Sequence, residues 1–151
     1  MAIRRASDSE AGELSRLAIA AKAHWGYAQE LLREWRPQLS ITRKDIRSRP
    51  TFVITVHGSI AGFYSLQPGA EAWKLEHLWV RPGFIGRGVG TRLLRHALQT
   101  AQTSGAAHLI VDADPNAAAF YIRCGAMKVG EVPAPIPGEP GRVRPQLKFA
   151  V

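Results

Sequence analysis

The stretch spanning residues 75–94, LEHLWVRPGFIGRGVGTRLL, constrains the fold of this chain more than any other part of it. An apolar strand leads into a glycine-rich turn, and the turn leads directly into an amphipathic helix. Gly83, Gly86, Gly88 and Gly90 free the backbone to present successive N–H groups. Unpaired donors and the positive end of the helix dipole favour an anion at such a helix start. The sequence therefore predicts a phosphate-binding loop.

The 151 residues are enough for one domain with its own core, so we expect a single domain over residues 1–151. No run approaches the ~20 apolar residues of a membrane helix, and we expect no membrane partner. The N-terminus MAIRRASDSE lacks the apolar segment of a signal peptide. The single cysteine, Cys124, forms no internal disulfide. These features predict a cytoplasmic protein.

The net charge is +8, but the 20 basic residues are scattered along the chain and form no dense basic run. We therefore expect no nucleic-acid partner. Arg81, Arg87 and Arg92 stand close to the glycine loop and would favour a small phosphate ligand. The five histidines show no metal-ligand spacing, and with one cysteine we expect no metal site.

Local patterns predict α/β elements in the order of a mixed, mostly antiparallel sheet. A capping box at Ser7–Glu10 predicts a helix to about residue 23, and Thr42–Asp45 is a second helix start. Further helices are expected from Tyr27 to just before Pro37, after the glycine loop to about residue 104, and from an N-cap at Asp114 to Gly125. Strands are expected at 2–5, 51–56, 59–66, 71–80, 108–111, 126–132 and 143–151, the last broken at Pro145.

Three kinds of glycine-rich phosphate loop compete for this stretch. A P-loop needs a lysine at a fixed place after its glycines, and none stands there. A dinucleotide-binding loop needs GxGxxG and an acidic residue at the end of the next strand. Gly86 and Gly88 begin that motif and Asp112 suits the acidic role, but Thr91 takes the place of the last glycine. The dinucleotide loop, and with it an NAD(P)-binding protein, stays as an alternative.

The third kind of loop comes from a resemblance to a known family. Residues 72 to about 132, with LEHLWVRPGFIGRGVGTRLL and LIVDADPNAAAFYIRCGAMKVGEV, resemble the GCN5-related N-acetyltransferase (GNAT) family. That resemblance implies a mixed, mostly antiparallel sheet of six to seven strands with helices on both faces. It also implies acetyl-CoA as co-substrate, bound by a loop of pattern [RQ]xxGx[GA]. In this chain Ile85 stands where the family usually has Arg or Gln.

The resemblance also implies which residues contact acetyl-CoA. The loop amides would hold its pyrophosphate, and the strand ending at Val80 would splay from the parallel strand 108–111 to admit the pantetheine arm. A backbone N–H near Val80 would stabilise the oxyanion that forms on the thioester carbonyl. The cofactor-binding residues implied are Leu78, Trp79, Val80, Ile85, Gly86, Arg87, Gly88, Val89, Gly90, Thr91, Asn116 and Tyr121.

Acetyl transfer to an amine needs a base for the ammonium and a proton donor for the departing thiolate. Tyr121 matches the family tyrosine by its spacing to Gly125, and we interpret it as the general acid; otherwise it is a core aromatic residue. Glu76 is the candidate base, because it lies on the same strand face as Leu78 and Val80. It could equally be a structural surface glutamate, with water taking the proton. His77 points to the opposite face.

The acceptor is the least readable part of the site. Residues 25–35 and 133–141 would line its pocket, and Trp25, Tyr27 and Glu30 are the candidate substrate-binding residues. They suit a small-molecule or peptide amine. The function predicted is an N-acetyltransferase that moves an acetyl group from acetyl-CoA to a primary amine by direct attack of the amine. The resemblance to the family is also compatible with a homodimer. The alternative is a CoA- or nucleotide-binding module without catalysis.

Overall fold

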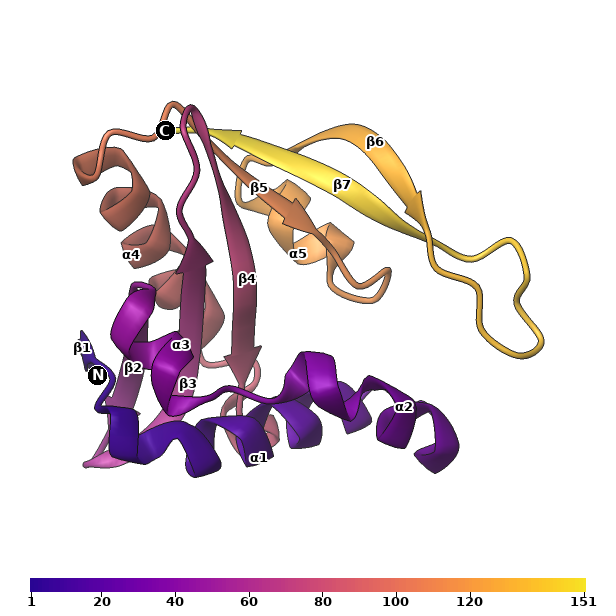
Figure 1. Ribbon diagram of the computed structural model, residues 1–151, viewed down its shortest axis with the longest axis horizontal. Coiled ribbons are helices and arrows are strands. Elements are labelled where there is room, and N and C mark those ends of the chain that lie inside the picture. Colours follow the sequence, from indigo (N-terminus) through magenta and orange to yellow (C-terminus); the bar gives the residue numbers. More distant parts are fainter. The chain divides into compact units, whose positions relative to one another are not determined.

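The computed structural model describes residues 1–151, which form seven strands and five α-helices (Figure 1). The strands form one mostly antiparallel sheet in the order β1-β2-β3-β4-β5-β7-β6. The strands are β1 (Ala2–Arg5), β2 (Thr51–Val56), β3 (Ser59–Gln67), β4 (Ala72–Val80), β5 (His108–Asp112), β6 (Met127–Pro133) and β7 (Val143–Ala150). The helices are α1 (Ala11–Ala23), α2 (Gln29–Leu39), α3 (Arg43–Ser48), α4 (Val89–Thr103) and α5 (Ala118–Arg123). This architecture confirms the predicted fold class.

The chain divides into two compact units. The first unit holds Met1–Gln67 and Glu76–Ala97, and the second holds Pro68–Leu75 and Leu98–Val151. Strand β4 and helix α4 therefore each contribute residues to both units. The single domain expected from the sequence stays a prediction.

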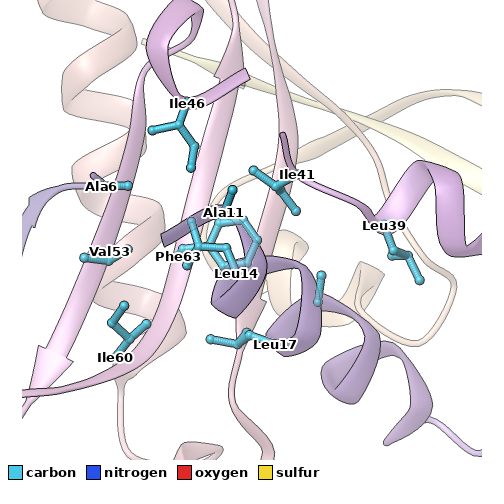
Figure 2. Close-up of a cluster of buried hydrophobic side chains, with 11 residues drawn as sticks. Ala6, Ala11, Leu14, Leu17, Leu39, Ile41, Ile46, Val53, Ile60 and Phe63 are labelled. Carbon is cyan, nitrogen blue, oxygen red and sulfur yellow. The ribbon is translucent and has the colours of Figure 1, made fainter. Parts of the chain in front are cut away.

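The first unit is built around an apolar cluster between its sheet and its N-terminal helices, shown in Figure 2. Leu14 and Leu17 of α1 and Phe63 of β3 are fully buried there, as the apolar periodicity of α1 requires. On the other face of the same strands, the Tyr64 hydroxyl lies 2.6 Å from Nδ1 of His96 on α4. Neighbouring residues Phe63 and Tyr64 thus serve opposite faces, and helices cover both.

Local capping explains where the first helices begin. The N–H of Ser7 donates to Glu10 Oε1 at 2.8 Å, and the chain enters α1 through a short 3₁₀ turn, Asp8–Glu10. At α3, Thr42 and Asp45 exchange two hydrogen bonds of 3.0 Å. Both predicted capping boxes are therefore confirmed, and each satisfies donors that a helix start leaves unpaired.

Helix α2 corrects one prediction, because it does not end before Pro37. The helix continues through Pro37 to Leu39. Proline removes only its own N–H, so near the C-terminal end it costs one intrahelical bond. Leu39 is 5% exposed and belongs to the apolar cluster, and the hydroxyl of Ser40 donates to the carbonyl of Arg36 at 2.7 Å. Burial and capping together outweigh the lost bond.

In the second unit, the start of β4 pairs with β5 in parallel, with Ala72 opposite His108 and Lys74 opposite Ile110. Strand β5 pairs in turn with β7, antiparallel. The predicted break at Pro145 is wrong, since β7 is continuous through this residue. Pro145 lies opposite Glu131, and its carbonyl still accepts from the N–H of Ala113 at 2.9 Å. The missing proline N–H costs the strand only one donor.

Candidate active site

The glycine loop joins β4 to α4 in the first unit. After a 3₁₀ turn at Pro82–Phe84, the chain takes positive φ at Gly86 (82°) and Gly88 (78°), conformations that side chains oppose. A Cβ added to either glycine would meet no heavy atom within 4 Å, so the loop is open there. Its hydrogen bonds are donated by Phe84, Ile85 and Arg92, and the N–H groups from Gly86 to Thr91 remain unused. This arrangement fits an anionic group at the start of α4.

Arg81 fixes the chain where it enters this loop. Its backbone N–H donates to the carbonyl of Ala61 at 2.8 Å, and its Nε donates to the carbonyl of Ile60 at 2.9 Å. Its Nη2 lies 3.2 Å from Oε2 of Glu13 on α1. The sequence pattern had favoured Arg81 as a phosphate partner, but these contacts make it an internal anchor. Arg87 lies over the ring of Phe84, at 5.3 Å from the ring centroid.

Glu76 lies on β4, and one oxygen of its carboxylate is buried without a partner. Oε2 has almost no exposed surface and makes no hydrogen bond. A buried carboxylate oxygen without a donor is costly, and such atoms in folded proteins call for an explanation. Leu78 and Val80, which alternate with Glu76 along the strand, are only half-buried. This face of β4 can accept a donor that the protein itself does not supply.

His77 and Trp79 occupy the opposite face of β4, as the alternation predicts. The indole N–H of Trp79 donates to Nδ1 of His77 at 3.0 Å, and Trp79 packs against the apolar cluster of Figure 2. Because Nδ1 accepts this bond, the imidazole is neutral with its proton on Nε2. Burial lowers the pKa of His77 below its ordinary value, despite the nearby charge of Glu76. The side chain of Trp79 is thus part of the packing between the sheet and the N-terminal helices.

The predicted acceptor residues Trp25, Tyr27 and Glu30 differ in their surroundings. Tyr27 meets Trp35 edge to face, with ring centroids 4.8 Å apart. The ammonium of Lys22 lies 5.1 Å from the centroid of Tyr27 and 4.7 Å from that of Trp35, within cation–π range. Trp25 is 43% exposed, and its ring lies edge to face with that of His24, at a centroid distance of 6.1 Å. Glu30 is exposed on α2.

Tyr121 lies in the second unit, on α5, and is 5% exposed. Its ring packs edge to face with Phe120 and with Phe149 of β7, at centroid distances of 5.2 and 6.4 Å. Burial raises the pKa of Tyr121 well above its ordinary value, and the charges of Asp114 and Cys124 raise it further. The phenol therefore stays protonated throughout the neutral range.

The turn before α5 corrects the predicted helix start. Asp114 does not cap α5, which begins at Ala118 with Ala117 as its N-cap. Instead, Asp114 Oδ1 accepts from the backbone N–H of Asn116 at 2.8 Å and from its Nδ2 at 3.0 Å. The side chain closes a local turn of the kind that aspartate favours, and this competes with helix capping. Asn116 is exposed at the tip of this turn.

No three histidine, cysteine, aspartate or glutamate side chains are placed so that they could hold a metal ion. None of the helices combines the length and the apolar character that crossing a membrane requires.

Comparisons with known proteins show the family. Residues 15–126 match the model of the acetyltransferase (GNAT) family, and the chain belongs to this family. A streptothricin acetyltransferase from Streptomyces lavendulae is 35% identical over 68 residues, which cover 44% of this chain and only 36% of that protein.

Solved structures support the same fold. A GCN5-related N-acetyltransferase from Rhodopseudomonas palustris has a TM-score of 0.80 at 24% identity, covering 99% of this chain and 95% of that one. The PaiA N-acetyltransferase from Thermoplasma acidophilum, solved in complex with coenzyme A, has a TM-score of 0.81 at 17% identity and covers 99% and 98% of the two chains. At these identities, the similarity establishes the fold.

Several contacts around the candidate site have no local signal in the sequence. Arg81 and Glu13 are 68 residues apart in the chain, and neither stands in a motif that pairs them. The ammonium of Lys22 is brought to Tyr27 and Trp35 by the packing of α1 against α2. The sequence hints at the Lys22 contact only through its position, about one helical turn before the aromatic residues that follow.

The raised pKa of Tyr121 predicts a loss of stability at high pH. An unfolded tyrosine ionises near pH ~10, whereas the folded phenol keeps its proton. Above this pH the folded state therefore binds more protons, and the free energy of unfolding falls as pH rises. The fall should be steeper in the wild type than in Tyr121→Phe, by up to about 1.4 kcal/mol per pH unit.

Urea denaturation of both proteins between pH 8 and pH 11 measures this difference. Below pH ~9.5 the two stability curves should run parallel, whatever the offset between them, because neither state ionises there. Parallel curves across the whole range would contradict the burial of a neutral phenol at this position.

Proposed function

We propose that this protein transfers an acetyl group from acetyl-CoA to a primary amine. The observation that carries the proposal is the open loop of Gly86–Thr91, whose unused N–H groups meet the start of α4 inside the segment that matches the family. Positive φ at Gly86 and Gly88 aims this backbone, and the missing side chains leave room for a ligand. A diphosphate suits several converging N–H donors at a helix start. Cofactor contacts by Ile85, Arg87, Val89, Gly90 and Thr91 follow from this placement.

The reaction sets the demands on the protein. When bound, acetyl-CoA supplies a thioester carbonyl and a thiol leaving group. The C–N bond forms and the C–S bond breaks, the nitrogen of the ammonium gives up two protons, and the thiol sulfur takes one, so that one proton is released in all. The protein must therefore accept a proton, stabilise negative charge on the carbonyl oxygen and supply a proton to sulfur.

Glu76 is our candidate for the proton acceptor, acting directly or through water. Its buried, unpartnered Oε2 is supporting evidence, because an ammonium or a water bound there would supply the missing donor. An amine with a pKa of about 10.4 is almost fully protonated at neutral pH, so a base is needed before attack. In the same strand, the backbone of Leu78, Trp79 and Val80 is our candidate for binding the pantetheine arm and the oxyanion.

Tyr121 is our candidate for the proton donor to the departing sulfur. Burial and the charge of Asp114 keep its phenol protonated, so the group is available as a donor at any pH at which the amine reacts. Asn116, exposed at the turn that leads to α5, is the candidate for a further contact with the cofactor arm.

The acceptor class is the least constrained part of the proposal. We place the acceptor amine near Trp25, Tyr27 and Glu30, where an exposed aromatic ring and an exposed carboxylate would attract a cation. A small-molecule or peptide amine fits, and a chain with one cysteine suits the reducing cytoplasm.

Blocking the loop should abolish cofactor binding. Gly88→Val places a branched side chain at φ 78° in the loop, and Gly58→Val places the same side chain at φ 80° in the β2–β3 turn of the same unit. Both changes strain the backbone similarly, so their stabilities should fall alike. We expect calorimetry to show acetyl-CoA binding weakened at least ~10-fold by Gly88→Val alone, since only this glycine borders the proposed anion site.

Equal binding by wild type and Gly88→Val would contradict the assignment of the loop. Thermal stabilisation by NAD(P), and none by CoA, would instead support the dinucleotide alternative.

Removing the phenol should slow the chemistry and spare binding. Tyr121→Phe should lower kcat about 10²-fold with little change in KM for acetyl-CoA, because proton donation acts in the transition state. Thiol release from acetyl-CoA at saturating amine measures both constants. If kcat stays unchanged while single-turnover rates show that chemistry limits turnover, Tyr121 is not the acid.

Replacing the candidate base should produce a defect that depends on pH. Glu76→Gln keeps the shape of the side chain but cannot accept a proton, so kcat/KM should fall about 10²-fold at neutral pH. The defect should shrink as pH approaches the amine pKa of about 10.4, because the amine then ionises unaided. Glu71→Gln, a change of the same kind at an exposed position just before β4, is the control. A Glu76→Gln profile identical in shape and height to wild type would leave water or substrate ionisation as the only base.

A further inference from the structure

A buried ion pair in the second unit links two loops that the sequence treats separately. Arg142 Nη2 lies 3.8 Å from Asp114 Oδ2, and each of the two side chains is 7% exposed. By contrast, the Lys128–Glu131 pair of the same unit joins side chains that are 49% and 48% exposed. Exposed pairs contribute little to structure, whereas buried pairs are sensitive to the loss of either partner.

On one side, the pair determines the conformation of the turn that leads into α5. Asp114 uses Oδ1 for both N–H groups of Asn116, and its backbone carbonyl accepts from the N–H of Ala117 at 2.9 Å. With Oδ2 directed to Arg142, the carboxylate has its two oxygens assigned to different tasks. One closes the turn that exposes Asn116, and the other ties this turn to the rest of the unit.

On the other side, the pair holds the connection between β6 and β7. Arg142 Nη1 donates to the carbonyl of Ala134 at 2.9 Å, and the N–H of Ala134 donates to the carbonyl of Arg142 at 3.0 Å. Arg142 therefore closes the base of the proline-rich segment 133–141. The sequence favours this segment as part of the acceptor pocket, and within it the backbone forms a single bridge, between Ile136 and Glu139.

We propose that Arg142 is a positioning residue for acetyl transfer. It holds the Asn116 turn in the conformation that binds the cofactor arm, and through Ala134 it fixes the acceptor segment against the same carboxylate. The inference rests on the proposed function, and it adds a residue that contacts neither reactant. The affinity for the cofactor should therefore depend on the guanidinium of Arg142, although this group does not contact the cofactor.

The fork of the guanidinium is essential to this role. One nitrogen faces a carboxylate and another faces a carbonyl, a geometry that a single ammonium cannot reproduce. Arg142→Lys should therefore retain the charge but lose part of the positioning. Asp114→Asn should keep an oxygen for the N–H groups of Asn116 while removing the charge that Arg142 pairs with.

The experiment is a double-mutant cycle read out by cofactor binding. Arg142→Met should raise both the Kd for CoA and the KM for acetyl-CoA about 10-fold, with kcat at saturation within about 3-fold of wild type, a split that marks lost ground-state binding. Arg142→Lys should fall between Arg142→Met and wild type. In the Asp114→Asn background, Arg142→Met should have little further effect, because the two residues act as one unit. Lys128→Met is the matched control, and we expect it to bind CoA as wild type does.

Each variant is first checked for cooperative unfolding, and binding is measured where all of them are folded. Arg142→Met that binds CoA like wild type overturns the inference and leaves the proposed function intact. So does a cycle in which the two changes simply add, or a loss of kcat with unchanged KM. A wild-type protein that binds no CoA overturns both the inference and the proposed function.

Discussion

The passage of the chain from β4 into α4 is the constraint on which the rest of the first unit depends. The backbone must leave a sheet, adopt positive φ at Gly86 and Gly88, and begin a helix without using the N–H groups between them. Such a segment has little packing of its own, so it must be anchored at its ends. Arg81 provides the first anchor through two carbonyls of β3 and the carboxylate of Glu13, and buried Val89 begins the helix that provides the second. The contacts of the neighbouring segments therefore hold the loop in this open conformation.

The two faces of β4 differ in whether their polar groups have hydrogen-bond partners. His77 and Trp79 are bonded to each other and packed towards the N-terminal helices, so that burial holds the imidazole neutral. Glu76 alternates with them and keeps one carboxylate oxygen buried without a donor. The strand thus carries a satisfied polar pair on one face and an unsatisfied acceptor on the other. Only the second has a reason to bind something from outside the chain.

Local chemistry explains what could be predicted from the sequence. The capping boxes at Ser7 and Thr42 depend only on neighbours in the chain, and the structure confirms them. The loop glycines at Gly86 and Gly88 likewise adopt the positive φ that glycine allows. Two predicted breaks at prolines and one predicted helix cap were wrong. At Pro37 the burial of Leu39 outweighed the local breaking signal, and at Pro145 the strand loses only one donor. Before α5 the side chain of Asp114 closes a turn instead of capping the helix.

The candidate site divides in the same way. The loop glycines and Tyr121 stand in patterns that a reader of the sequence can recognise. The contacts of Arg81 with Glu13 and of Arg142 with Asp114 join segments that carry no common motif, and only the fold brings them together. Long-range ion pairs of this kind cannot be inferred from spacing, because any acidic residue could have been the partner. They are nevertheless the contacts that hold the loop and the turn in place.

The central claim is that the chain moves an acetyl group from acetyl-CoA to an amine. The most direct test incubates the purified protein with acetyl-CoA and a panel of polyamines, amino acids, aminoglycosides and peptide N-termini. Free thiol and acetylated amine are followed together by thiol titration and mass spectrometry. The account predicts that at least one amine class yields the two products in equal amounts and faster than without protein. Folded protein that binds acetyl-CoA yet releases no thiol with any amine of the panel would contradict the transferase and support a binding module.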